Sequence, residues 1–138
     1  MSVPGVNGIE HTGIVAMDTV DLSRWYLELF KGREVSRSEG DRPVIFLSFG
    51  QGALLELIPA PEEGGPPATD HVHLCFSVSS LNAAVAGLEE RGIALDRPVF
   101  EAYEGSSVAF FRDPEGNLLQ LVQRVPGSGV HKSVFGDV

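Results

Sequence analysis

The stretch that most constrains the fold runs Phe111-Arg-Asp-Pro-Glu-Gly-Asn-Leu-Leu-Gln-Leu121. Its Asp, Pro and Gly residues stand at the positions that a tight turn favours. The residues that follow, Leu118 to Val122, are apolar on both strand parities apart from Gln120, which is typical of a strand with both faces covered. The stretch therefore predicts the turn and final strand of a hairpin.

The first half of the chain repeats this pattern. Between the two halves lies the segment 59–70, which is rich in Pro and Gly and cannot continue a helix or strand. Three pairs coincide across it: Leu54-Leu-Glu-Leu57 with Leu118-Leu-Gln-Leu121, His11 with His73, and Gly32 with Gly92. The sequence therefore predicts an internal repeat.

Both halves predict the order β-α-β-β-β. In the first half we expect strands at 8–18, 34–37, 44–49 and 53–58, and a helix at 22–30. In the second half we expect strands at 71–78, 99–103, 107–111 and 117–123, and a helix at 81–91. Capping residues predict the helix boundaries. Asp18 or Asp21 is the expected N-cap of the first helix, and Gly32 and Gly92 are expected to end the first and second helices.

These elements define one α+β domain of two tandem βαβββ modules, which form a cupped mixed sheet around a metal cavity. Module one covers about 8–58, a linker covers 59–70, and module two covers about 71–124. The C-terminal tail, 125–138, is expected to be an arm or a loosely held segment.

Four polar side chains stand at equivalent places in these apolar strands. A carboxylate at Glu56 is costly there unless it is paired or metal-bound, and Gln120 is its counterpart in the repeat. His11 and His73 stand in the equivalent opening strands. Two imidazoles and a carboxylate suit one divalent ion of zinc, nickel, cobalt, manganese or iron, and the Gln120 amide oxygen can complete the set.

Each of these residues also has a structural alternative. A single His or Glu in an apolar strand is more often a hydrogen-bonded core residue than a ligand. His71 shares strand parity with His73 and is expected at the rim, while Cys75 is expected to be a small buried apolar residue. The matched repeat positions favour metal binding for the set.

Composition narrows the class of partner. The formal net charge is −9, and no cluster of Lys and Arg predicts a nucleic-acid or anionic membrane partner. No apolar run is long enough for a membrane span, and the first residues lack the pattern of a signal peptide. With one cysteine and no possible intrachain disulfide, we expect a cytoplasmic protein, while the composition says little about small ligands.

The pattern as a whole resembles the vicinal oxygen chelate superfamily, which includes glyoxalase I, methylmalonyl-CoA epimerase, extradiol dioxygenases, and fosfomycin- and bleomycin-resistance proteins. The resemblance covers about residues 8–124 and is carried by three segments: His11 to Asp18, His73 to Val78, and Phe111 to Leu121. It implies that the first and fourth strands of each module supply metal ligands, at His11, Glu56, His73 and Gln120. It also implies a homodimer.

The resemblance implies a metal-dependent, glyoxalase-like lyase or isomerase. The metal would chelate vicinal oxygens of a small carbonyl substrate and stabilise an enediolate. Gln120 departs from the glutamate that many members carry there, so Glu56 is the expected catalytic base. Val15 replaces an arginine common in glyoxalase I, which argues against a true lactoylglutathione lyase. The alternatives are a non-haem iron dioxygenase and a metal-free, bleomycin-resistance-like binding protein.

Overall fold

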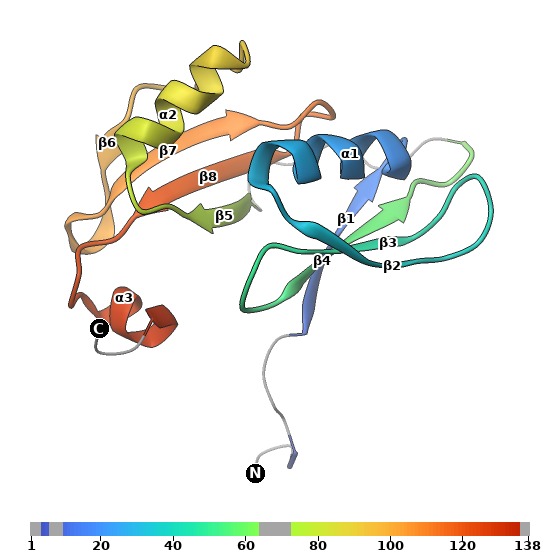
Figure 1. The fold of residues 1–138 in the computed structure, drawn as a ribbon, viewed down its shortest axis with the longest axis horizontal. Helices are drawn as coiled ribbons and strands as arrows, with labels where there is room; N and C mark the ends of the chain where they lie inside the picture. The colour runs from blue at the N-terminus through green and yellow to red at the C-terminus, as the bar shows by residue number, and fades with distance from the viewer. Residues whose placement is uncertain (1–3, 6–9, 64–72, 136–138) are drawn as a thin grey trace. The chain divides into compact units, whose positions relative to one another are not determined.

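A computed structural model describes residues 4–5, 10–63 and 73–135 of the chain. It divides into two compact units, Met1–Pro67 and Ala68–Val138. Each unit contains one of the predicted modules, and from here on module one and module two refer to these units. Each module has its own mixed four-stranded sheet and carries a helix against it (Figure 1). The predicted α+β architecture of two tandem βαβββ modules is confirmed. Among the described helices, none has the length and hydropathy to cross a bilayer.

The elements of module one are β1 (His11–Ala16), α1 (Thr19–Phe30), β2 (Arg33–Arg37), β3 (Ile45–Ser48) and β4 (Leu54–Pro59). Its sheet has the order β1-β4-β3-β2, in which β1 and β4 are parallel and the other pairs are antiparallel. Residues 6–9, part of the expected first strand, lie outside the described residues. The parallel pair brings the first and fourth strands of the module side by side.

Helix α1 begins earlier than its apolar pattern predicts. Asp18 is the N-cap, and its carboxylate accepts a hydrogen bond of 2.9 Å from the backbone N–H of Asp21. That bond satisfies a donor that the first helical turn leaves unpaired. Of the two proposed caps, Asp18 fills the position and Asp21 lies within the first turn.

The predicted stop of α1 at Gly32 is wrong. Lys31 adopts the left-handed conformation instead, with φ 55°, and its N–H bonds to the carbonyl of Leu27. Gly32 is required for a different reason: a Cβ atom there would lie 2.4 Å from Phe49 Cδ1 and 2.5 Å from the Ser48 carbonyl oxygen. In module two, Gly92 takes a positive φ of 72° after its helix, as predicted.

The core of module one lies between α1 and one face of its sheet. Leu47, Leu57 and Ile45 are fully buried there, together with Tyr26 of the helix. Because side chains alternate along a strand, the intervening residues lie on the opposite face, which we call the distal face. The distal face carries His11, Phe46 and Glu56, which keep partial exposure.

The elements of module two are β5 (His73–Ser77), α2 (Leu81–Glu90), β6 (Phe100–Glu101), the 3-10 turn η1 (Tyr103–Gly105), β7 (Ser107–Arg112), β8 (Leu118–Gln123) and α3 (Gly129–Phe135). Its sheet, in the order β5-β8-β7-β6, repeats the parallel pairing of the first and last strands. The start of the expected strand at 71–78, including His71, and linker residues 64–70 lie outside the described residues.

The turn between β7 and β8 is organised by Asp113, which is 4% exposed. One carboxylate oxygen accepts hydrogen bonds from the N–H groups of Glu115 and Asn117, and the other accepts one from the Asn117 side chain. Gly116 supplies a positive φ of 87°. The turn chemistry predicted from the sequence is therefore confirmed in this hairpin.

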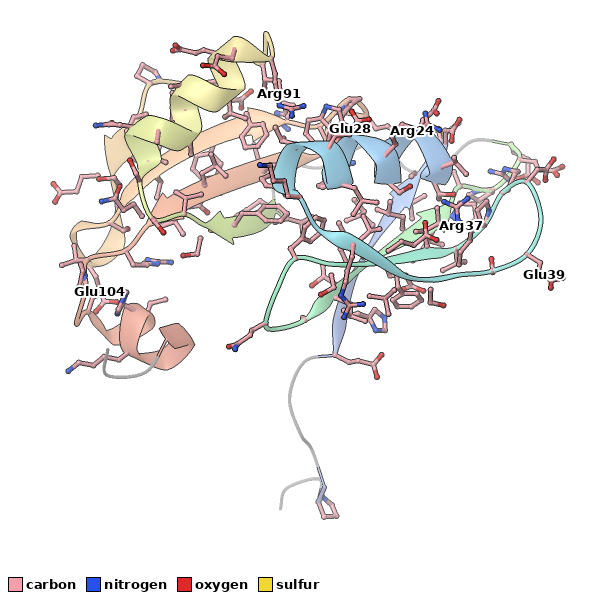
Figure 2. The ribbon with its side chains drawn as sticks, in the orientation of Figure 1. Arg24, Glu28, Arg37, Glu39, Arg91 and Glu104 are labelled. Carbon is pink, nitrogen blue, oxygen red and sulfur yellow. The ribbon has the colours of Figure 1, made fainter. Side chains whose placement is uncertain are left out.

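The C-terminal tail is more ordered than the expected arm. Residues Gly129–Phe135 form α3, and Glu104 lies beside this helix (Figure 2). Its carboxylate accepts hydrogen bonds from the first N–H groups of α3, 2.9 Å from Gly129 and 3.1 Å from Val130. These bonds hold the pKa of the Glu104 carboxyl below its usual value. The carboxylate satisfies unpaired donors and complements the helix dipole.

Candidate metal centre

His11 and Glu56 lie together on the distal face of module one. Strands β1 and β4 pair in parallel with His11 opposite Leu54, so Glu56, two residues along β4, is a diagonal neighbour on the same face. The Nε2 atom of His11 lies 3.3 Å from Oε1 of Glu56. The side chains are 38% and 20% exposed, so a small ligand can reach both.

Glu10 engages the other nitrogen of the same imidazole. Its Oε1 lies 3.0 Å from His11 Nδ1, which sets Nδ1 as the hydrogen-bond donor. In a neutral ring, the other nitrogen, Nε2, is then a hydrogen-bond acceptor. It faces the Glu56 carboxylate oxygen, which is also an acceptor. A metal ion between Nε2 and the Glu56 carboxylate would bind both acceptors. A carboxylate behind a metal-binding histidine is a common supporting contact.

Two further residues shape this site. Phe46 pairs with Glu56 across the sheet and lies edge-on to the His11 ring, with ring centroids 5.5 Å apart. Gly13 stands beside Glu56 in β1, and a Cβ there would lie 3.3 Å from Oε1 of Glu56 and 3.1 Å from Ile58. Sequence reasoning missed Glu10, Gly13 and Phe46, although the carboxylate next to His11 was a visible signal.

Module two repeats the geometry with different chemistry. His73 pairs with Leu118, so Gln120 is its diagonal neighbour, as Glu56 is to His11. Phe110 pairs with Gln120 and lies edge-on to the His73 ring at 5.7 Å. The equivalence of these positions, predicted from the repeat, therefore extends to the aromatic residue that supports each histidine.

Cys75 stands where module one has Gly13, because it pairs with Gln120 as Gly13 pairs with Glu56. The prediction that Cys75 is buried is wrong, since the residue is exposed. Its immediate neighbours still desolvate the thiol enough to raise its pKa, although the positive charge of Arg124 acts the other way. Cys75 is accessible although its strand is apolar, because it lies on the partly covered face of the module-two sheet that carries His73 and Gln120.

The structure thus brings the predicted ligands together in pairs. His11 and Glu56 belong to module one, and His73 and Gln120 belong to module two. Among the described residues, no group of three or more His, Cys, Asp or Glu side chains gathers around one point. The pair that is present has donors fit for a metal.

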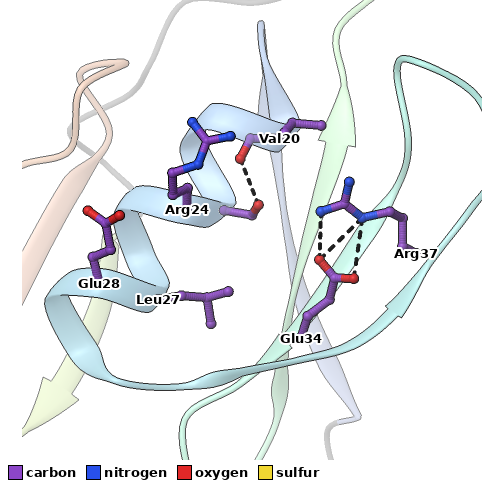
Figure 3. Close-up of a pocket in the computed structure, with 7 residues that line it drawn as sticks. Val20, Arg24, Leu27, Glu28, Glu34 and Arg37 are labelled. Atoms are coloured by element: carbon purple, nitrogen blue, oxygen red, sulfur yellow. Dashed lines mark hydrogen bonds and ion pairs between the residues drawn. The ribbon is translucent and has the colours of Figure 1, made fainter.

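A cavity of about 340 Å³ lies elsewhere in module one, between α1 and β2 (Figure 3). Two of its lining residues, Arg37 and Glu34, bind each other at 2.7 Å, and a third, Arg24, binds Asp21 outside the lining at 2.9 Å. The apolar part includes Leu27. None of the predicted metal ligands lines it, so it is separate from the His11–Glu56 pair.

The family model that matches this chain is described as the glyoxalase/bleomycin resistance protein/dioxygenase superfamily, and it covers residues 8–121. The chain belongs to this superfamily. The match includes both modules and all four predicted ligand positions. Superfamily membership agrees with the βαβββ repeat, and the superfamily contains both enzymes and proteins without catalytic activity.

Relatives within the superfamily match over nearly their whole length. The uncharacterized protein YaeR of Escherichia coli (strain K12) is 29% identical over 127 residues, which cover 87% of this chain and 98% of YaeR. A superfamily member from Sphaerobacter thermophilus has a TM-score of 0.73 at 18% identity, covering 86% of this chain and 98% of its own. A lactoylglutathione lyase from Agrobacterium tumefaciens has a TM-score of 0.67 at 20% identity, covering 88% and 96%. These two structures establish the fold.

Proposed function

We propose that this protein is a metal-dependent, glyoxalase-like lyase or isomerase acting on a small carbonyl compound with two neighbouring oxygens. The observation that carries the proposal is the 3.3 Å separation between His11 Nε2 and Glu56 Oε1 on an accessible sheet face. For metal–ligand bonds of about 2.0–2.2 Å, two adjacent ligands stand roughly 3.0–3.5 Å apart. The pair therefore has the spacing of two ligands on one ion.

His73 and Gln120 complete the proposed ligand set. They hold the same strand register as His11 and Glu56, and they share the phenylalanine contact. Two imidazoles, one carboxylate and one amide oxygen suit zinc, nickel, cobalt, manganese or iron. A divalent ion with a single anionic protein ligand keeps a net positive charge, which favours oxygen atoms of a substrate that become negative during reaction.

Glu56 is the proposed catalytic residue. When bound, the metal supplies Lewis-acid stabilisation of negative charge on the substrate oxygens. Glu56 removes the proton from the adjacent carbon and returns it to the product. Gln120 cannot perform this step because an amide does not accept a proton at ordinary pH. Gly13 leaves room for the Glu56 side chain beside the His11 ring.

The proposal also covers the partners, the cellular location and the oligomeric state of the protein. With a net charge of −9 and without a cluster of Lys and Arg, we expect no nucleic-acid or membrane partner. The single cysteine favours a cytoplasmic protein, and a homodimer is what membership of the superfamily leads us to expect. The substrate is a small molecule.

Metal content tests the binding half of the proposal. Protein purified without a His-tag should hold about one divalent ion per chain, as a mononuclear site requires. His11→Ala should lose the metal and Glu56→Ala should bind it far more weakly. Glu34→Ala is the matched control, because it removes a module-one carboxylate that pairs with Arg37. Stoichiometric metal in a His11→Ala, His73→Ala double variant would overturn the site.

Proton exchange tests the catalytic half. With the metal-loaded protein, hydroxyacetone or a thiohemiacetal should take up solvent deuterium at the carbon next to its carbonyl group. NMR measures this uptake. Absence of exchange together with dioxygen consumption by the iron form would replace the lyase with the dioxygenase. A protein that binds no metal in any form would support the binding-protein alternative.

A further inference from the structure

In module two, the guanidinium of Arg97 lies over two aromatic rings, on the sheet face that carries His73 and Gln120. The Arg97 guanidinium carbon lies 4.6 Å from the Phe110 ring centroid and 5.0 Å from that of Phe100. The two rings are themselves stacked, with centroids 6.0 Å apart and planes inclined by 17°. Cation–π contacts of this kind attract the guanidinium to the ring faces.

Arg97 has no acidic partner among the described residues. The two ring contacts are its interactions there, and it takes part in no further hydrogen bond or ion pair. The nearby Arg112 differs, because it binds Asp96 at 3.0 Å. In a chain with a net charge of −9, an arginine that is held in place and lacks a carboxylate is open to an external anion.

Phe110 connects this arginine to the proposed metal ligands. It contacts the His73 ring at 5.7 Å, pairs with Gln120 across the sheet, and lies beneath Arg97. Phe110 is 9% exposed, so its ring is a fixed platform within a buried cluster that includes Val108 and Leu118. Arg97, His73 and Gln120 thus surround one ring on the same face of one module.

We propose that Arg97 binds an oxyanion group of the substrate, a carboxylate or a phosphate, and so selects anionic carbonyl compounds. The planar guanidinium of an arginine can donate two N–H groups to two oxygens of one anion. The proposal rests on the proposed function, because the substrate it describes is the one held by the metal. What the present proposal adds is that this substrate carries a negatively charged group.

The test compares ligands that share vicinal oxygens and differ in charge. Dihydroxyacetone is neutral, dihydroxyacetone phosphate adds a phosphate, and hydroxypyruvate adds a carboxylate. Binding to metal-loaded protein is followed by titration calorimetry and by the NMR signal of the Arg97 Nε–H group. Wild type should bind at least one of the anions about tenfold more tightly than dihydroxyacetone, as a charge-assisted hydrogen bond implies. The preferred anion distinguishes phosphate from carboxylate.

Two substitutions separate anion binding from a purely structural role. Arg97→Gln keeps much of the side chain over the rings and should lose the preference for the anion, with unchanged affinity for dihydroxyacetone. Arg97→Lys should recover part of the preference, since it keeps the charge without the planar fork. Arg91→Ala is the control, because it removes the same charge from the end of α2 (Figure 2).

The metal content of every variant is measured as well, so that failure of the proposed metal site can be told apart from failure of the anion proposal. Loss of metal from wild type counts against the metal site, whereas an effect of Arg97 is judged only in protein that holds its metal. If both anions bind wild type no more tightly than dihydroxyacetone, or if Arg97→Gln weakens all three ligands equally, the anion proposal is wrong.

Discussion

Gln120 pairs across the sheet with Phe110 in module two, just as Glu56 pairs with Phe46 in module one. The two positions therefore have the same backbone setting and differ in one chemical respect, the presence of a negative charge. This difference allows the proposed roles of ligand and base to be separated by exchanging the two side chains.

The exchange of amide and carboxylate should change metal binding and proton transfer in different ways. Glu56→Gln should retain some metal through its amide oxygen but lose deuterium exchange at the substrate carbon. Gln120→Glu should bind metal more tightly because it adds a negative charge to the ligand set. Calorimetric metal titration and NMR of the substrate measure the two effects. Full exchange by metal-loaded Glu56→Gln would show that Glu56 is not the base.

Gly32→Ala should destabilise the protein by about 2–3 kcal/mol, because its new methyl group would overlap the Phe49 ring and the Ser48 carbonyl. Gly92→Ala, which has open space around it but a positive φ, should lose only about 1 kcal/mol. Urea unfolding followed by tryptophan fluorescence and circular dichroism gives both values. Equal effects would mean that the Gly32 environment relaxes around the added atom.

Asp113→Ala should destabilise module two by about 2–4 kcal/mol, since it leaves the turn donors of Glu115 and Asn117 without their buried acceptor. Asn117→Ala removes only the side-chain donor and should lose about 1 kcal/mol. The free energy of unfolding measures this order. A neutral Asp113→Ala substitution would contradict the importance of the carboxylate for the hairpin.

The attachment of α3 should depend on pH through Glu104. Its pKa is lowered in the folded protein, so the ionised form is stabilised by the N–H groups of Gly129 and Val130. This stabilisation is present above the unfolded pKa and is lost as pH falls through the lower folded value. Hydrogen exchange of those two amides should therefore lose protection at acidic pH, after correction for intrinsic exchange rates.

Glu104→Gln should remove most of this pH dependence and lower the protection of both amides already at neutral pH. Glu89→Gln, on the exposed side of α2, is the control for a change of one charge. Protection of Gly129 and Val130 that stays constant in Glu104→Gln would show that other contacts hold the helix.

The proposed homodimer predicts a mass in solution of about twice the 14.8 kDa of the chain. Val15 and Met17, at the end of β1, are 36% and 61% exposed, and β1 is an edge strand of its sheet. An exposed edge with apolar side chains is a favourable place for a second copy to pair. Light scattering at micromolar concentration measures the mass, and a value near that of the single chain contradicts the dimer.

The sequence alone determined the features that depend on neighbours in the chain. The Asp-Pro-Glu-Gly turn, an aspartate cap at Asp18 or Asp21 and the alternation of strands follow from local chemistry, and the repeat placed His11 and Glu56 in equivalent positions to His73 and Gln120. Parallel pairing of first and last strands in each module then made each histidine a diagonal neighbour of its polar partner.

Only the tertiary structure decided the features that depend on what lies across space. Lys31 rather than Gly32 adopts the left-handed conformation, and Gly32 lies where a Cβ atom would overlap the Phe49 ring. Cys75 is exposed although its strand is apolar, and Glu104 caps a helix from which it is distant in sequence. Arg97 meets Phe110 only through the fold of module two. Such contacts depend on the distances and coverage that packing sets, and a linear pattern of residue types does not contain them.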